Sequence, residues 1–147
     1  MLFIHKDVRT DPRFPLSSPE LERIFMHLAE VFGLEACSVG LKIVDDQAMA
    51  QVHSQFMGCC GPTNILSFPA AEDTHLGDMI LSADTLSREA FLYNQDTCVY
   101  TVRLLAHGLL HLMGYDHGPA MDALTEQAVE TFTQVSGADP DRLFATL

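Results

Sequence analysis

The amino-acid sequence predicts an α+β domain built on a small mixed sheet packed by helices. Segments whose apolar residues alternate, as in strands, occur beside segments whose apolar residues repeat at helical spacing. The two kinds follow one another without a strict β-α-β rhythm, which favours the α+β class. The chain has 147 residues, 48% of them hydrophobic, which is enough to bury one core. We therefore expect residues 1–147 to form a single domain.

Four segments have the features of strands. Residues 2–5 are a short apolar candidate, and residues 37–43 alternate apolar with small or polar side chains, as a half-buried strand does. Residues 63–68 are the third candidate, which Pro69 either ends or marks as an edge strand, because proline cannot donate a ladder hydrogen bond. The sequence DMILS at residues 78–82 is the fourth.

Five segments have apolar residues at helical spacing, over residues 18–33, 45–56, 82–92, 96–113 and 119–137. Near the ends of two of them, Phe56 and Val135 are predicted to face inward, and in a third the apolar spacing runs on to Leu92. The helix over 96–113 is apolar on nearly every side and should be buried. Its exception is a stripe of residues four apart, Arg103, His107 and His111, and polar groups on a buried helix need partners.

The charge and the cysteines limit the function classes. Eight basic and twenty acidic residues give a net charge of -12, which opposes non-specific attraction to nucleic-acid phosphates. No run of 18 apolar residues and no secretory signal is present, so we expect a soluble cytoplasmic protein without a membrane partner. The cysteines lack C-x-x-C spacing, so Cys59 and Cys60 are predicted to be reduced loop residues, and Cys37 and Cys98 core residues.

The sequence HGLLHLMGYDH at residues 107–117 predicts a metal site. His107 and His111 are four residues apart, so they share one face of a helix. Gly114 can end that helix in a left-handed conformation, and the reversal can bring His117 back toward the pair. Three imidazole nitrogens at about 2.0–2.1 Å leave one position of a tetrahedral zinc ion open, as in catalytic sites. Nickel and copper also suit imidazole ligands.

Three histidines do not supply a general base. The H-E-x-x-H peptidases carry a glutamate after the first histidine, where this chain has Gly108, so a peptidase mechanism is disfavoured. Asp116 could act on the metal's water or orient a ligand, and its structural alternative is to cap the turn. Arg103 is a candidate phosphate-binding cation, and its alternative is an ion pair with Asp78. Arg88 is a weaker candidate cation.

The histidine motif, together with PTNILSFP at residues 62–69 and LGDMILS at 76–82, closely resembles the YbeY family of metal-dependent endoribonucleases. The resemblance covers roughly residues 38–135. It implies a four-stranded, zincin-like fold with PTNILSFP as the edge strand beside the metal, and one zinc ion held by His107, His111 and His117. It also implies single-strand-specific cleavage in maturation of the 3′ end of 16S ribosomal RNA and in ribosome quality control. The implied partners are ribosomal RNA, the small ribosomal subunit and ribosome-associated proteins, and not DNA.

This chain departs from the family pattern in the segment before the edge strand. Met57 stands where the family usually carries an arginine, Cys59 and Cys60 replace charged residues, and Asn64 stands where aspartate is common. A methionine cannot bind phosphate or stabilise developing charge. Two alternatives therefore stay open: a ribosome-associated assembly factor with a mainly structural metal, and a metal-dependent hydrolase of another substrate such as peptide.

Overall fold

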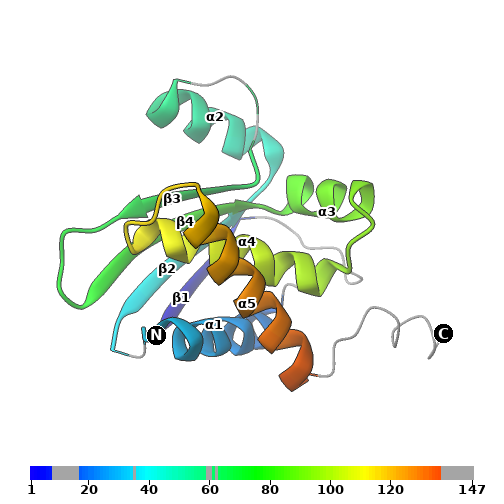
Figure 1. Cartoon of the computed structure of the whole chain (residues 1–147). Helices are drawn as coiled ribbons and strands as arrows, with labels where there is room; N and C mark the ends of the chain where they lie inside the picture. Colours follow the sequence, from blue (N-terminus) through cyan, green and yellow to red (C-terminus); the bar gives the residue numbers. More distant parts are fainter. Residues whose placement is uncertain (8–16, 35, 59–60, 62, 137–147) are drawn as a thin grey trace.

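The computed structural model describes residues 1–7, 17–34, 36–58, 61 and 63–136, and the strands of this part form one mixed sheet (Figure 1). The strands are β1 (Leu2–Lys6), β2 (Ser38–Val44), β3 (Ile65–Pro69) and β4 (His75–Ser82). Their order is β1-β2-β4-β3, with β1, β2 and β4 parallel and β3 antiparallel to β4. The predicted four-stranded mixed sheet is confirmed, and β3 is an edge strand that ends in Pro69.

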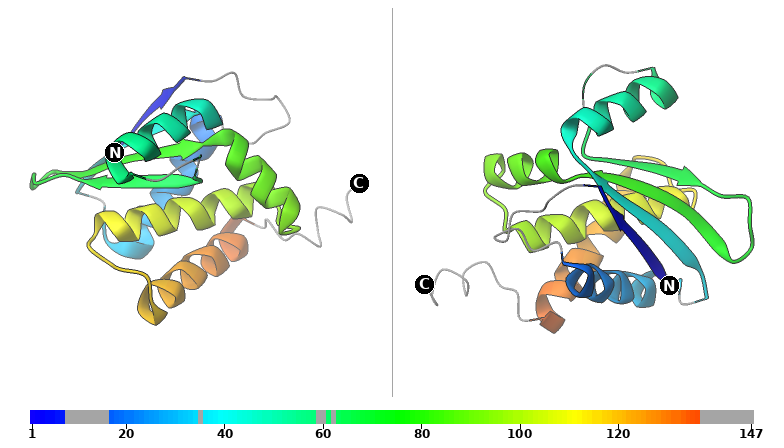
Figure 2. Two further views of the ribbon diagram at one scale, coloured as in Figure 1. Left: turned by 90° about the horizontal axis from the view of Figure 1, so that it is seen from above. Right: turned by 180° about the vertical axis from the view of Figure 1, so that it is seen from behind.

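The described helices are α1 (Ser18–Phe32), α2 (Asp46–Met57), α3 (Ala83–Leu92), α4 (Thr97–Leu112) and α5 (Pro119–Ser136). In Figures 1 and 2, α1, α4 and α5 lie on one side of the sheet and α2 lies on the other. The first four helices begin where a side-chain oxygen accepts a hydrogen bond from a free backbone N–H, and the residues that do so are Ser17, Asp45, Ser82 and Asp96. The end predicted for α5, Gly137, lies outside the described residues.

The strands divide their side chains between two hydrophobic clusters. Met79 and Leu81 of β4 join the larger cluster, which also contains the buried faces of α1, α4 and α5. The smaller cluster lies on the α2 side and is built on Val44, Met49 and Leu66. Alternate residues of a strand point to opposite faces, so the period-2 pattern of the sequence specifies which face each helix covers.

Three residues of the predicted apolar spacing are exposed, and two of them, Phe56 and Val135, were predicted to face inward. Phe56, Leu92 and Val135 have exposed fractions of 61%, 66% and 79%. Each lies in the last turn of its helix, where the apolar spacing continues beyond the surface that the helix covers. Phe56 instead contacts the ring of Phe68 edge to face, with ring centroids 5.5 Å apart.

Gly77 allows the end of α4 to approach the sheet. Its φ of 152° is one that L side chains rarely adopt. A Cβ at this position would lie 2.5 Å from the carbonyl oxygen of Phe68 and 2.7 Å from Cδ2 of Leu112. Glycine is therefore required where β3, β4 and the last turn of α4 meet.

We predict that Gly77→Ala lowers the free energy of unfolding by about 2–4 kcal/mol, because the added methyl group meets backbone and strains φ. Urea denaturation measures this change. Gly40→Ala in the neighbouring strand is the matched control, since its methyl group would meet the exposed carboxylate of Asp78, which can turn into solvent. The control should change the free energy by less than about 1 kcal/mol, and equal effects of the two variants would contradict the prediction.

Candidate metal centre

The structure brings the three predicted histidines together. His107 and His111 lie one turn apart on α4, and His117 lies in the turn before α5. One nitrogen from each ring lies within 4.8 Å of the other two, and the Nε2 atoms of His107 and His111 are 3.1 Å apart. The ring centroids are separated by 4.6–5.0 Å. His107 and His111 are half-buried and His117 is exposed, so the cluster is open to solvent on one side.

The turn after α4 has the hydrogen bonds of a Schellman motif. The N–H of Gly114 donates to the carbonyl of His111, and the N–H of Tyr115 donates to that of Leu110, both at 3.0 Å. Gly114 has a φ of 98°, as the sequence predicted, and an added Cβ would meet nothing within 4 Å. Backbone conformation, not space, therefore requires this glycine, and the reversal carries His117 back to the helix.

The same turn orients His111. Its Nδ1 lies 3.0 Å from the carbonyl oxygen of Tyr115. Because a carbonyl can only accept, Nδ1 carries the proton of the neutral ring, and the lone pair is on Nε2. That Nε2 faces Nε2 of His107. Histidine ligands of metals usually donate their second ring nitrogen in this way, which fixes both tautomer and orientation.

The donor set fits a divalent transition metal. Burial, and then the neighbouring His111 and His117, lower the pKa of His107, against the opposing charge of Asp122. The lowered pKa favours the neutral form of the ring, which is the form that binds a metal. Two ligands at about 2.0–2.1 Å on a tetrahedral ion are about 3.3 Å apart, close to the 3.1 Å observed between the two Nε2 atoms. Three protein ligands leave one tetrahedral position for water or substrate.

The edge strand β3 is tied to α4 directly beside His107. The hydroxyl of Ser67 donates to the carbonyl of Gly108 at 2.9 Å. A Cβ on Gly108 would lie 2.6 Å from Sδ of Met79 and 2.9 Å from Cδ1 of Ile65. The position that carries the peptidase glutamate in H-E-x-x-H therefore faces the packed sheet in this chain, and a glutamate there would have to displace the side chains of Met79 and Ile65.

Arg103 forms an ion pair, but not with the partner predicted. Its Nη1 and Nη2 donate to Oε1 and Oε2 of Glu126 on α5, the second contact at 3.4 Å. The predicted pair with Asp78 is wrong, since the carboxylate of Asp78 lies 3.2 Å from Nε2 of His75. The reason is the alternation along β4, which points Asp78 to the sheet face that α4 does not cover.

The remaining groups singled out in the sequence are Asp116, Arg88 and Met57. Asp116 is exposed in the turn, next to His117. Arg88 donates to Asp46 of α2 at 2.8 Å. Burial works against ionisation of Asp46, but hydrogen bonds from Thr85, Arg88 and Ser82 outweigh it and lower its pKa. Met57, at the position of the family arginine, is 51% exposed.

Sequence reasoning missed three groups beside the histidines. These are the carbonyl of Tyr115, the carboxylate of Asp122 and the carboxylate of Glu126. The spacing of Asp122 and Glu126 was an available signal, because it repeats the four-residue spacing of Arg103 and His107 on a second helix. Nothing local in the sequence indicates the carbonyl contact, which exists only once the turn has formed.

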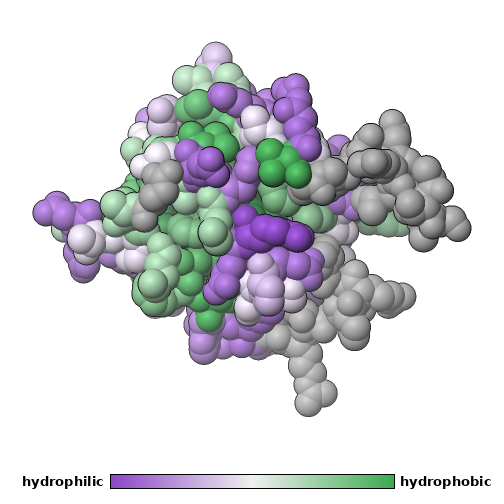
Figure 3. Space-filling model, turned by 90° about the horizontal axis from the view of Figure 1, so that it is seen from below, coloured by the Kyte–Doolittle hydropathy of each residue, from purple (hydrophilic) through white to green (hydrophobic). Residues whose placement is uncertain are grey.

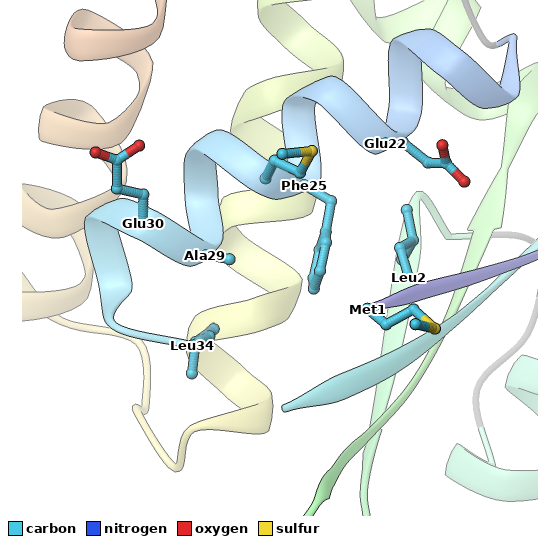
Figure 4. Close-up of a pocket in the computed structure, with 8 residues that line it drawn as sticks. Met1, Leu2, Glu22, Phe25, Ala29, Glu30 and Leu34 are labelled. Carbon is cyan, nitrogen blue, oxygen red and sulfur yellow. The ribbon is translucent and has the colours of Figure 1, made fainter. Parts of the chain in front are cut away.

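Two hollows of the structure lie away from the histidines. One of about 620 Å³ lies between β1 and α1, with Leu2 and Phe25 among its lining residues (Figure 4). Another of about 480 Å³ lies on the α2 side of the sheet and includes Phe3 and Phe68. Seen from below, from the side of α1 and α5, hydrophobic areas of the surface lie next to hydrophilic ones (Figure 3). None of the three histidines lines either hollow.

The remaining expectations concern the cysteines and the absence of a membrane-spanning helix. Cys37 and Cys98 are free and partly buried, and burial raises the pKa of the Cys98 thiol, which keeps it protonated and unreactive. Cys59 and Cys60 lie outside the described residues. Among the described helices, none has the length and apolar character needed to cross a membrane.

Comparison with known proteins identifies a family and a solved structure of similar fold. Residues 11–134 match the family described as "Endoribonuclease YbeY". The endoribonuclease YbeY of Oleidesulfovibrio alaskensis is 42% identical over 86% of this chain and 89% of its own length. That of Nitratidesulfovibrio vulgaris is 40% identical over 88% and 93%. The solution structure of TM1509 from Thermotoga maritima has a TM-score of 0.70 at 23% identity, over 97% of this chain and 95% of that one, and supports the α+β fold. The chain therefore belongs to the endoribonuclease YbeY family.

Proposed function

We propose that this protein is a single hydrolase domain that cleaves phosphodiester bonds of RNA, with one zinc ion held by His107, His111 and His117. The observation that carries the proposal is the convergence of three imidazole nitrogens, one of them oriented by a backbone carbonyl. Membership of the endoribonuclease YbeY family supports RNA as the substrate.

We further propose the finer role that the family resemblance implies. The substrate would be single-stranded precursor RNA near the 3′ end of 16S ribosomal RNA, met on the small ribosomal subunit in the cytoplasm, and the activity would also serve ribosome quality control. The net charge of -12 supports a substrate held by a local site rather than by general attraction to the protein surface.

The proposed chemistry divides between the metal and the chain. His107, His111 and His117 would hold the zinc ion, which would supply Lewis acidity toward a phosphoryl oxygen or a water molecule. Tyr115 orients His111 through its carbonyl. Asp116, exposed beside His117, is the candidate group to accept a proton from water, and Arg103, one turn before His107, is the candidate to bind phosphate.

A second function is favoured by specific observations. A ribosome-associated assembly factor with a mainly structural metal would explain Met57 in place of arginine and the pairing of Arg103 with a carboxylate. The open side of the histidine cluster opposes it, because structural zinc sites are closed by four protein ligands. The peptide alternative is disfavoured by the packing at Gly108.

We predict that His111→Ala reduces bound zinc from about one equivalent to less than about a tenth, because a site with two remaining histidines loses a ligand and its oriented geometry. Emission spectrometry of the gently purified protein measures the metal. His5→Ala is the control, since His5 is exposed and contacts Asp7 on a different part of the chain. A wild-type protein with less than about a tenth of an equivalent of transition metal would contradict the proposal.

Loss of the metal should abolish cleavage and leave the fold in place. We predict that His117→Ala lowers the rate of cleavage of a single-stranded ribosomal RNA precursor by about a hundredfold or more. The thermal unfolding midpoint should change little, because His117 is exposed and lies outside both hydrophobic clusters. Gel electrophoresis and circular dichroism measure the two quantities. Loss of the folded state together with the metal would favour the structural alternative instead.

A further inference from the structure

Two helices place charged side chains opposite one another beside the histidines. On α4, Arg103 and His107 are one turn apart, and on α5, Asp122 and Glu126 are one turn apart. Glu126 forms an ion pair with Arg103. The stripe that holds the metal ligands therefore ends in an arginine that a carboxylate already occupies.

Arg103 contacts Glu126 with the same geometry with which arginine binds a phosphate. Two guanidinium nitrogens donate to the two oxygens of one anion, which is the fork geometry that arginine also offers to phosphate. Arg103 is 30% exposed and Glu126 is 63% exposed, so the carboxylate is the partner on the solvent side. Exposed ion pairs are weak, and another anion can compete for this one.

Arg103 is well placed to contact RNA bound at the metal. Residues four apart on a helix have Cβ atoms about 5–6 Å apart, so a phosphate on Arg103 would neighbour the one at the histidines. Lys42 and Arg88 are paired on other elements, with Asp7 at 3.1 Å and Asp46 at 2.8 Å. Arg103 is thus a described cation that shares a helix face with the metal ligands.

We infer that Glu126 is a specificity-determining residue whose carboxylate occupies Arg103 in place of a phosphate, so that RNA must displace it to bind beside the metal. The inference rests on the proposed function, because it takes RNA as the ligand. Displacement weakens apparent affinity by the fraction of molecules in which Arg103 is free. Only a ligand with a second phosphate next to the one at the metal gains the arginine contact, which favours a polynucleotide over a single nucleotide.

Glu126→Gln tests the inference because it removes the charge and keeps the size of the side chain. The measurement is the dissociation constant of the zinc-loaded protein for a short, fluorescein-labelled, single-stranded 2′-O-methyl oligoribonucleotide, by fluorescence anisotropy at several salt concentrations. We expect binding to become about three- to tenfold tighter. The slope of affinity against salt should steepen, because salt weakens the Arg103–Glu126 pair and in the wild type this partly offsets the counterions that the phosphate contact releases.

Glu130→Gln is the matched control, because it removes the same charge from an exposed residue one turn further along α5. It should change the dissociation constant by less than about twofold. The gain from Glu126→Gln should also disappear in an Arg103→Ala background. The inference is overturned if Glu126→Gln gives no gain, gives no more than Glu130→Gln, or gives the same gain without Arg103.

The binding measurement is independent of cleavage, so the two ideas can fail separately. If Glu126→Gln tightens binding and the wild-type protein does not cut RNA, the inference stands and the proposed activity fails. If the wild-type protein cuts RNA and Glu126→Gln leaves binding unchanged, the activity stands and the inference fails. Thermal unfolding of each variant confirms that the folded protein is being compared.

Discussion

The site depends on how closely α4 packs against the β3–β4 edge of the sheet. An added methyl group at Gly108 would lie 2.6 Å from Met79, and one at Gly77 would lie 2.7 Å from Leu112. The helix and the sheet therefore each have a glycine, without a side chain, where they touch. Burying α4 on this side leaves its polar stripe at the margin toward α5, where His107 and His111 can face an ion. The same packing removes the space for a side chain after His107.

The turn that ends α4 also orients the histidines of the candidate metal site. The Schellman turn satisfies the last carbonyls of the helix and places the Tyr115 carbonyl against Nδ1 of His111. Both nitrogens of that ring are then used, one by the turn and one by the site. A change in the turn would therefore disturb the tautomer of His111 as well as the position of His117.

Whether a feature could be predicted from the sequence depends on how far apart along the chain the interacting residues lie. The histidine cluster, the role of Gly114 and the helix starts depend on residues within about a turn of one another. The first two were predicted, and the helix starts were predicted to within about two residues. The partner of Arg103 depends on how α5 lies against α4, a tertiary relation that spacing within one segment does not contain. Apolar spacing likewise cannot say where the surface covered by a helix stops, which is why Phe56 and Val135 were misplaced.

The acidic balance of the chain shapes how it can hold RNA. Lys42, Arg88 and Arg103 each lie against a carboxylate, as expected where twenty acidic residues surround eight basic ones. When most basic side chains are already paired, an RNA phosphate can contact one only by replacing a protein carboxylate. The net binding free energy is then the difference between two similar ion pairs. Selectivity for RNA then depends on a site where such an exchangeable ion pair lies next to a metal site. In this chain the face of α4 that carries Arg103, His107 and His111 combines such an ion pair with histidines that could hold a metal.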